Sequence, residues 1–276
     1  MKMKLLNSKK KQTVFLISFS ALVLLAIGMS GFFIGEDTLG IQLDNKNSAT
    51  SFGHPFGTDW LGRDMLGRTL KGLSLSMGVG LVAAFTSTVI ALVLSLLATW
   101  NKFFDRIVTG LIDLFLSVPH IVILLLISFA FGGGYKGVII GLALTHWPSL
   151  TRVLRAEMLQ IKSRDYVNIS RQFGKSKLWI ARHHLFPHVL SQLFIGALLL
   201  FPHAILHEAA ITFLGFGLPA EQPAIGIILS ESMRYLSIGM WWLAFFPGLC
   251  LLFMVGLFDL LGKNLRTYFD PFHSQK

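Results

Sequence analysis

Long apolar runs separated by polar segments dominate the pattern of this chain. A helix needs roughly 20 residues to cross a bilayer core about 30 Å thick. Six runs meet or nearly meet that length, with approximate limits 13–34, 74–99, 107–131, 137–151, 189–217 and 239–262. Pro148, near the end of the short fourth run, favours a tilt or break, and Pro202 favours a kink in the fifth. The sequence therefore predicts an all-α polytopic membrane protein with six transmembrane helices.

The polar segments define the expected organisation of the chain, in which we find no internal repeat and no second folded domain. We expect an N-terminal tail, a first transmembrane helix, a long outer loop, a transmembrane domain containing a long inner loop, and a C-terminal tail. These parts are residues 1–12, 13–34, 35–73, 74–262 with the inner loop at 152–188, and 263–276. Long loops in a compact chain are usually functional, so both loops are candidate sites.

The basic residues predict the side of the membrane on which each loop lies. If the N-terminus is cytoplasmic, 18 of the 24 Lys and Arg residues fall in cytoplasmic segments, as the positive-inside rule requires. Both termini and the inner loop are then cytoplasmic. The first run follows Lys9, Lys10 and Lys11 as a secretory signal would, but it is long for a signal and has no convincing cleavage site. We therefore expect a retained helix.

Composition excludes several classes of protein. With 53% hydrophobic residues, 14% charged residues and a mean hydropathy of +0.65, the chain is too apolar for a soluble globular domain and requires a lipid bilayer around it. The net charge of +10 does not indicate a nucleic-acid partner, because the charges fall between apolar runs and no basic-aromatic recognition motif is present. Cys250 is the single cysteine, so no intrachain disulfide can form.

The inner loop has the pattern of two short helices. Tyr166, Ile169 and Phe173 recur at helical spacing and form a narrow apolar stripe on an otherwise polar helix. We expect Ser163 to cap this helix and Gly174 to end it with a positive φ. A second helix is expected to start at the cap Ser176 and to stop at Leu185-Phe186-Pro187.

The apolar stripe of the first inner helix is too small to bury itself, which leaves two interpretations. The helix lies on lipid headgroups, where basic residues beside an apolar edge are common, or it inserts into a groove of a cytoplasmic partner. The neighbouring Gly174-Lys175-Ser176 is not a phosphate-binding loop, because Ile169 stands where that motif needs a glycine. We find no ATP site in this chain.

The outer loop contains helix-start chemistry between residues 56 and 68. Thr58 or Asp59 can serve as the N-cap of a short amphipathic helix, with Leu61/Met65 and Leu66/Leu70 as apolar pairs at i,i+4. The segment also closely resembles the Gly-Thr-Asp-x-x-Gly-Arg-Asp-x-x-Ser-Arg motif of the dipeptide, oligopeptide and nickel permease family. The matching residues are Gly57, Thr58, Asp59, Gly62, Arg63, Asp64 and Arg68, with Gly67 in place of the serine.

The inner loop resembles the EAA loop of ABC-importer permeases over the run Asp165–Gly174. Here Asn168, Ile169 and Ser170 stand where that family prefers Glu-Ala-Ala. Further similarity lies in the runs Thr212–Gly217 and Phe258–Gly262, in Gly226, and in Asp270-Pro271. The resemblance covers nearly the whole chain from about residue 50 onward.

The resemblance implies a type I ABC-importer permease fold, located in a bacterial or archaeal cell membrane and without enzymatic activity or cofactor. It implies three kinds of partner besides the bilayer: a homologous second permease, two cytoplasmic ATP-binding subunits and an extracytoplasmic solute-binding protein. It also assigns the contact with the ATP-binding subunit to the inner helix, at Tyr166, Asn168, Ile169, Ser170, Phe173 and Gly174.

Ionisable residues inside the apolar runs are candidates for the translocation path, because such groups usually face a protein interior or an aqueous path. The candidates are Asp113, His146, His203, His207 and Glu208, and Asp259 lies in the sixth run. His203 and His207 share a helix face at i and i+4 and could approach one metal ion, although such residues also commonly hydrogen-bond across helices. A zinc-enzyme motif is excluded because position 211 is Ile.

The nature of the solute depends on finer similarities. His146-Trp147 and Leu206-His207 resemble the nickel branch of the family more than its peptide branch, which favours nickel or a metal chelate as the solute. Import of dipeptides or oligopeptides is the alternative within the same family. From a different class, an ion-coupled secondary transporter would use Asp113, Glu208 or Asp259 as its proton or cation site.

Overall fold

The computed structural model describes residues 2–35 and 40–269, so Asp270, Pro271 and Lys276 lie outside the described residues. This part of the chain is helical apart from its loops and one isolated bridge between Thr58 and Asp64, which confirms the all-α class. The elements are α1 (Lys2–Phe33), η2 (Leu43–Asn45), α2 (Met65–Trp100), α3 (Lys102–Ser117), α4 (His120–Ala130), α5 (Gly134–Lys162), α6 (Asp165–Gln172), α7 (Lys177–Ile180), the π-helix η3 (Ala181–Leu185), α8 (Phe186–Phe213), α9 (Ile225–Leu236) and α10 (Trp242–Phe269).

Four helical segments of the described chain are long and apolar enough to cross a membrane. They are 11–33 in α1, α2, the continuous segment Lys177–Phe213 that ends in α8, and α10; α3 and α4 together would form a fifth. The helix α5 contains the predicted run 137–151 but is not one of these segments, and its last turns carry Arg152, Arg155 and Lys162. A count of six spans therefore stays a prediction.

The sharp break in the bundle occurs at a proline that the sequence analysis did not single out. The run 107–131 was expected to be one helix, but α3 and α4 meet at an angle of 99°. Pro119 causes this break because a proline disfavours helical geometry at the preceding residue, and Val118 is extended with φ −105° and ψ 143°. In contrast, Pro148 and Pro202 lie inside the unbroken helices α5 and α8, where both are buried and neighbouring helices support the backbone.

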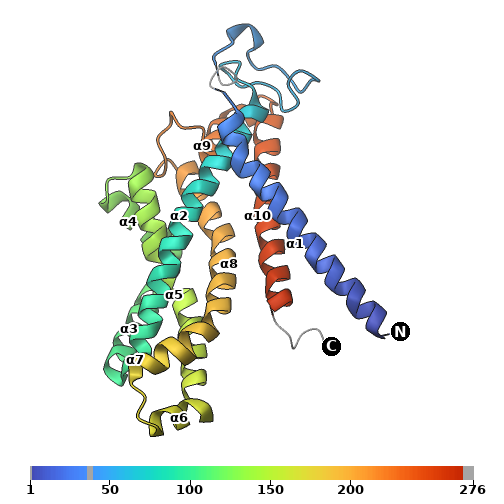
Figure 1. The fold of residues 1–276 in the computed structure, drawn as a ribbon. Helices are drawn as coiled ribbons and strands as arrows, with labels where there is room; N and C mark the ends of the chain where they lie inside the picture. Colours follow the sequence, from blue (N-terminus) through green and yellow to red (C-terminus); the bar gives the residue numbers. More distant parts are fainter. Residues whose placement is uncertain (1, 36–39, 270–276) are drawn as a thin grey trace.

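The helix α2 is the central element of the bundle and packs against α5, α8, α1 and α3 (Figure 1). Small residues on α2 allow this close approach: a Cβ on Gly80 would lie 2.8 Å from the side chain of Ile205 on α8. The hydroxyl of Ser87 donates a hydrogen bond of 2.9 Å to the Ala143 carbonyl of α5. Polar contacts of this kind fix the register of membrane helices, because the hydrophobic effect does not drive helices together within lipid.

The two ends of the bundle differ in what they carry. The start of α1, the end of α10 and the helix α6 lie at one end, and the segment 40–64 lies at the opposite end (Figure 1). This arrangement agrees with the expected separation of outer and inner loops. Which end faces the cytoplasm stays a prediction from the distribution of Lys and Arg.

Candidate coupling and translocation sites

The outer motif is a hydrogen-bonded turn, and the helix predicted to start at Thr58 or Asp59 is not present. The carboxylate of Asp59 accepts the backbone N–H groups of Leu61 and Arg63, each at 2.9 Å. These bonds compete with helix formation, as short polar side chains often do. The true N-cap is Asp64, which accepts from the Gly67 N–H at 2.8 Å and starts α2 at Met65.

Two glycines of the motif are required by its geometry. Gly57 and Gly62 have φ values of +71° and +77°, in the left-handed region that favours glycine. A Cβ on Gly62 would also lie 1.8 Å from the Gln42 carbonyl oxygen, so the chain crosses itself closely at this point. Thr58, which is fully buried, accepts the Ser48 N–H at 2.9 Å and joins the same crossing.

A buried ion network anchors this turn to the bundle. The Nη1 atom of Arg68 lies 2.6 Å from Asp59, and its Nη2 atom lies 2.8 Å from Glu231 on α9. The Nε atom of Arg63 donates to Asp59 at 2.7 Å. Asp59 and Arg68 are both almost fully buried, so removing either one would leave the other as an uncompensated buried charge. The outer motif therefore joins the loop, α2 and α9 into one unit.

The helix α6 forms in the predicted place, with two corrections at its boundaries. Ser163 is the C-cap of α5, and α6 starts after Arg164, which makes no side-chain cap; the expectation that Ser163 caps α6 was wrong. Gly174 has a φ of +74°, as predicted. The hydroxyl of Ser176 accepts the Trp179 N–H at 3.2 Å, which confirms it as the cap of α7.

The predicted stop at Leu185-Phe186-Pro187 is also wrong. The chain runs from α7 through the π-helix η3 into α8 without leaving helical geometry. Pro187 is the second residue of α8, and the wider turns of the π-helix η3 precede it directly. The second inner helix and the membrane helix α8 are therefore one continuous helical segment.

One face of α6 is packed and the other is exposed. Val167 is fully buried, and the Ser170 hydroxyl lies 2.9 Å from Nε2 of His184 on η3. The stripe Tyr166, Ile169 and Phe173 is 45%, 50% and 80% exposed. Asn168 and Gly174 are exposed as well. Among the sequence-predicted coupling residues, all but Ser170 thus lie on a surface that this chain leaves uncovered.

Ion pairs hold the helix that precedes α6. The guanidinium of Arg155 on α5 makes two bonds to Asp105 on α3, at 2.6 and 2.9 Å. The Lys162 ammonium at the end of α5 donates to the Thr99 carbonyl of α2. Burial lowers the pKa of Lys162, and the nearby charges of Arg171 and Lys177 lower it further. A force on α6 would therefore reach three helices of the bundle.

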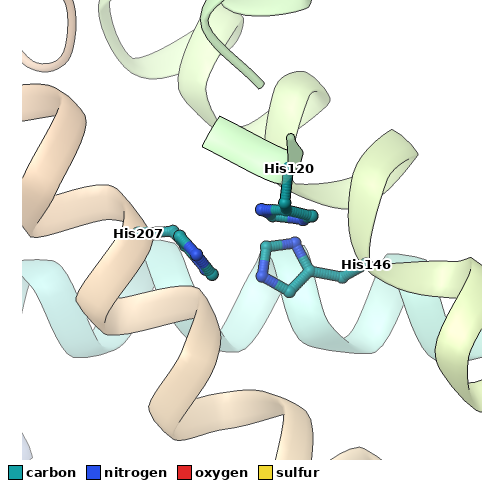
Figure 2. Close-up of side chains that lie close together, drawn as sticks. All are labelled: His120, His146 and His207. Atoms are coloured by element: carbon teal, nitrogen blue, oxygen red, sulfur yellow. The ribbon is translucent and has the colours of Figure 1, made fainter. Parts of the chain in front are cut away.

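Three histidines from three helices meet inside the bundle (Figure 2). His120 is the first residue of α4, His146 lies on α5 and His207 lies on α8. Their ring centroids are 4.6 Å apart for His120 and His146, 4.4 Å for His120 and His207, and 5.2 Å for His146 and His207. One ring nitrogen from each lies within 4.8 Å of the other two. We call this group the histidine cluster.

The sequence indicated only two members of the histidine cluster. His203 is exposed and is not a member of the group, which joins His207 to histidines from two other helices. His120 lies inside the predicted run 107–131, but the ionisable candidates chosen from the apolar runs did not include it. Two sequence signals could have found it: it is an ionisable residue inside an apolar run, and it directly follows Pro119, which breaks the helix between α3 and α4.

Close packing of α4 on α5 brings His120 to His146. A Cβ on Gly137 would lie 2.5 Å from the Ser128 carbonyl oxygen, and one on Gly141 would lie 3.0 Å from the Leu124 side chain. These two glycines of α5 leave no room for larger residues. The position of the histidine cluster therefore depends on small residues one and two turns away.

The remaining candidates lie apart from the histidine cluster. Glu208 is fully buried and accepts the Thr212 hydroxyl at 2.8 Å, and that hydroxyl accepts the Leu218 N–H in turn. This arrangement fixes the turn after α8. Asp113 is exposed and pairs with Arg152 at 3.2 Å, and Asp259 pairs with Lys263 within α10.

Comparison with known proteins decides the family. The family described as "Binding-protein-dependent transport system inner membrane component" matches residues 91–272. The chain belongs to this family. It is a permease subunit of an ABC importer in the inner membrane, and its energy source is therefore not the ion gradient of a secondary transporter.

Relatives of this permease support the assignment over most of its length. The dipeptide transport system permease protein DppC of Bacillus subtilis (strain 168) is 30% identical over 95% of this chain and 83% of its own length. A Brucella suis (biovar 1, strain 1330) protein named as a peptide transport system permease is 34% identical over 79% of this chain and 73% of its own.

A solved structure supports the fold of the permease. The chain from inward-facing conformations of the MetNI methionine ABC transporter has a TM-score of 0.60 at 22% identity, covering 74% of this permease and 97% of that chain. The likeness extends the family match to the arrangement of the helices. It agrees with the type I importer fold expected from the sequence.

Proposed function

We propose that this permease forms one half of the translocation pathway of an importer for dipeptides or other short peptides. The similarity to permeases named for peptide and dipeptide transport carries this proposal. A homologous second permease, two cytoplasmic ATP-binding subunits and an extracytoplasmic solute-binding protein complete the importer. The residues His146-Trp147 and Leu206-His207 favoured nickel as the solute, whereas the names of these relatives favour peptides.

The helix α6 is the proposed contact with the ATP-binding subunit. Its exposed stripe of Tyr166, Ile169 and Phe173 offers an apolar face for a groove of that subunit. The contact between Ser170 and His184 joins α6 to η3, which continues into α8. Closure of the ATP-binding subunits would move α6, and the ion pairs of α5 would pass this motion to the bundle as a change of access.

Gly174 provides the test of this coupling. A valine at φ +74° costs about 1–2 kcal/mol in backbone conformation, and a Cβ there meets no atom within 4 Å. The substitution therefore disturbs the end of α6 without a steric clash. We expect Gly174→Val to retain assembly and ATP hydrolysis and to reduce ATP-driven uptake at least about tenfold.

Gly239 supplies the matched control for this experiment. It has a φ of +86° and equally open surroundings, but it lies in the turn before α10. Gly239→Val should carry the same conformational cost and leave coupling unchanged. Wild-type uptake in the Gly174→Val complex would contradict a coupling role for α6.

A second candidate solute, nickel or a metal chelate, is favoured by one observation, the histidine cluster inside the bundle. Imidazole is a good ligand for nickel, whereas a peptide has no special need of three histidines. Uptake of labelled dipeptide and of labelled nickel by vesicles with the complete importer distinguishes the two. Saturable, ATP-dependent dipeptide uptake supports the peptide proposal, and nickel uptake without dipeptide uptake overturns it.

A further inference from the structure

The histidine cluster has unpaired nitrogens where polar groups are costly. His120 Nδ1, His146 Nε2 and His207 Nδ1 are buried and have no hydrogen-bond partner among the described residues. A buried polar atom without a partner costs about 1–3 kcal/mol. Three such atoms in one place indicate a ligand that the permease alone does not supply.

The tautomer of His146 follows from its contacts. Its Nδ1 lies 2.9 Å from the Leu142 carbonyl oxygen, which can only accept, so Nδ1 carries the ring proton. Its Nε2 therefore has a free lone pair. A histidine held by a carbonyl at one nitrogen and unpaired at the other has the usual arrangement of a metal ligand. His146 is also 6% exposed, so packing fixes its ring.

We propose that His120, His146 and His207 bind one divalent transition metal ion of the nickel, cobalt and zinc class. In a tetrahedral site with metal–nitrogen bonds of about 2.0–2.1 Å, the ligand nitrogens lie about 3.3–3.5 Å apart. The observed limit of 4.8 Å therefore requires only small movements of the rings. Three neutral imidazoles leave a fourth position open, as in zinc sites that accept a water or another ligand.

The ion would tie together elements that the sequence separates. His120 stands directly after the 99° break between α3 and α4, whereas His146 and His207 lie on the continuous helices α5 and α8. Metal binding would clamp α4 onto this pair. The inference goes beyond peptide import: a complex that imports peptides and binds no metal at the histidine cluster contradicts it and leaves the proposed function unaffected.

The experiment measures metal bound to the whole importer. The purified complex with its partner subunits is stripped with a chelator, equilibrated separately with Ni²⁺, Co²⁺ and Zn²⁺, and analysed for bound metal after gel filtration. We expect one bound ion per copy of this chain in the wild-type complex. In the His146→Gln and His207→Gln complexes the affinity for the ion should fall at least about tenfold, so that no ion remains after gel filtration. His203→Gln is the matched control, because His203 lies one turn from His207 and outside the cluster.

A measurement on the unaltered complex keeps the proposal testable if a variant fails to assemble. Co²⁺ in a three-imidazole, four-coordinate site gives visible absorption bands much stronger than those of the hydrated ion. We expect these bands in the wild-type complex. Their absence, the absence of a stoichiometric ion, or equal binding by the cluster variants would overturn the proposal.

A final comparison separates two sources of the ion. After loading with labelled nickel in vesicles, ATP is added to the wild-type complex. Release of the label into the lumen identifies the ion as cargo, and retention through many turnovers identifies it as a resident ion of the helix bundle. Both results count for the proposal only if the label is lost in the His146→Gln complex, and label that washes away from the wild-type complex before ATP is added contradicts it.

Discussion

Replacing Asp59 with Ala is expected to loosen the outer end of the permease. The carboxylate of Asp59 accepts two backbone N–H groups and pairs with Arg63 and Arg68. Removing one partner of a buried ion pair typically costs about 3–5 kcal/mol. Arg68 keeps its bond to Glu231, so we place the loss of unfolding free energy near the lower limit, about 3 kcal/mol.

Hydrogen exchange of the turn 58–64 gives the local readout of this prediction. The Leu61 and Arg63 amides should exchange much faster in Asp59→Ala, because their acceptor is gone. Asp59→Asn separates the two contributions, since its oxygen can still accept from these amides but its NH₂ group cannot pair with Arg68. It should preserve much of the turn and still lose stability.

Asp259→Ala is the control for this prediction. Its pair with Lys263 is exposed, with side-chain exposures of 45% and 71%, and exposed pairs contribute about 0–1 kcal/mol. Denaturant unfolding in detergent should therefore separate the two alanine variants by about 2 kcal/mol or more. An Asp59→Ala protein within 1 kcal/mol of wild type would refute the role assigned to the outer motif.

Three further substitutions test the packing and the caps. Gly137→Val should push α4 away from α5, because the new side chain would clash with the Ser128 carbonyl oxygen of α4. The variant should be destabilised by about 1–3 kcal/mol in denaturant unfolding and should bind metal more weakly at the histidine cluster. Gly110→Ala should stabilise α3 by about 0.5–1 kcal/mol in the same assay, because its Cβ meets no atom within 4 Å. Ser176→Ala should cost about 1 kcal/mol, measured as faster hydrogen exchange at the start of α7.

Local chemistry in the sequence predicted two boundaries of the inner loop correctly. Gly174 and Ser176 serve as the expected helix end and helix cap because their roles depend on residues within one turn. Long-range contacts explain the error in the outer loop. Thr58 and Asp59 look like helix caps in isolation, but Asp59 is held by Arg68, and Arg68 by Glu231 at a separation of 163 residues.

The histidine cluster shows the same limit more strongly. Periodicity within α8 predicted a pair of His203 with His207, because it compares only residues on one helix. His120 and His146 reach His207 from α4 and α5, through the break at Pro119 and the close packing at Gly137 and Gly141. No spacing rule along the chain contains that information.

Cross-linking at Phe173 tests the central claim that a separate ATP-binding subunit drives this permease through α6. Phe173→Cys is made in a Cys250→Ser background, so that the chain carries one thiol, and the assembled importer is treated with a short bifunctional reagent. We expect a product with the ATP-binding subunit whose yield changes with ATP. Phe129→Cys on α4, a position as exposed as Phe173, should give no such product. A complex that transports solute without any Phe173 cross-link to the ATP-binding subunit would contradict the account.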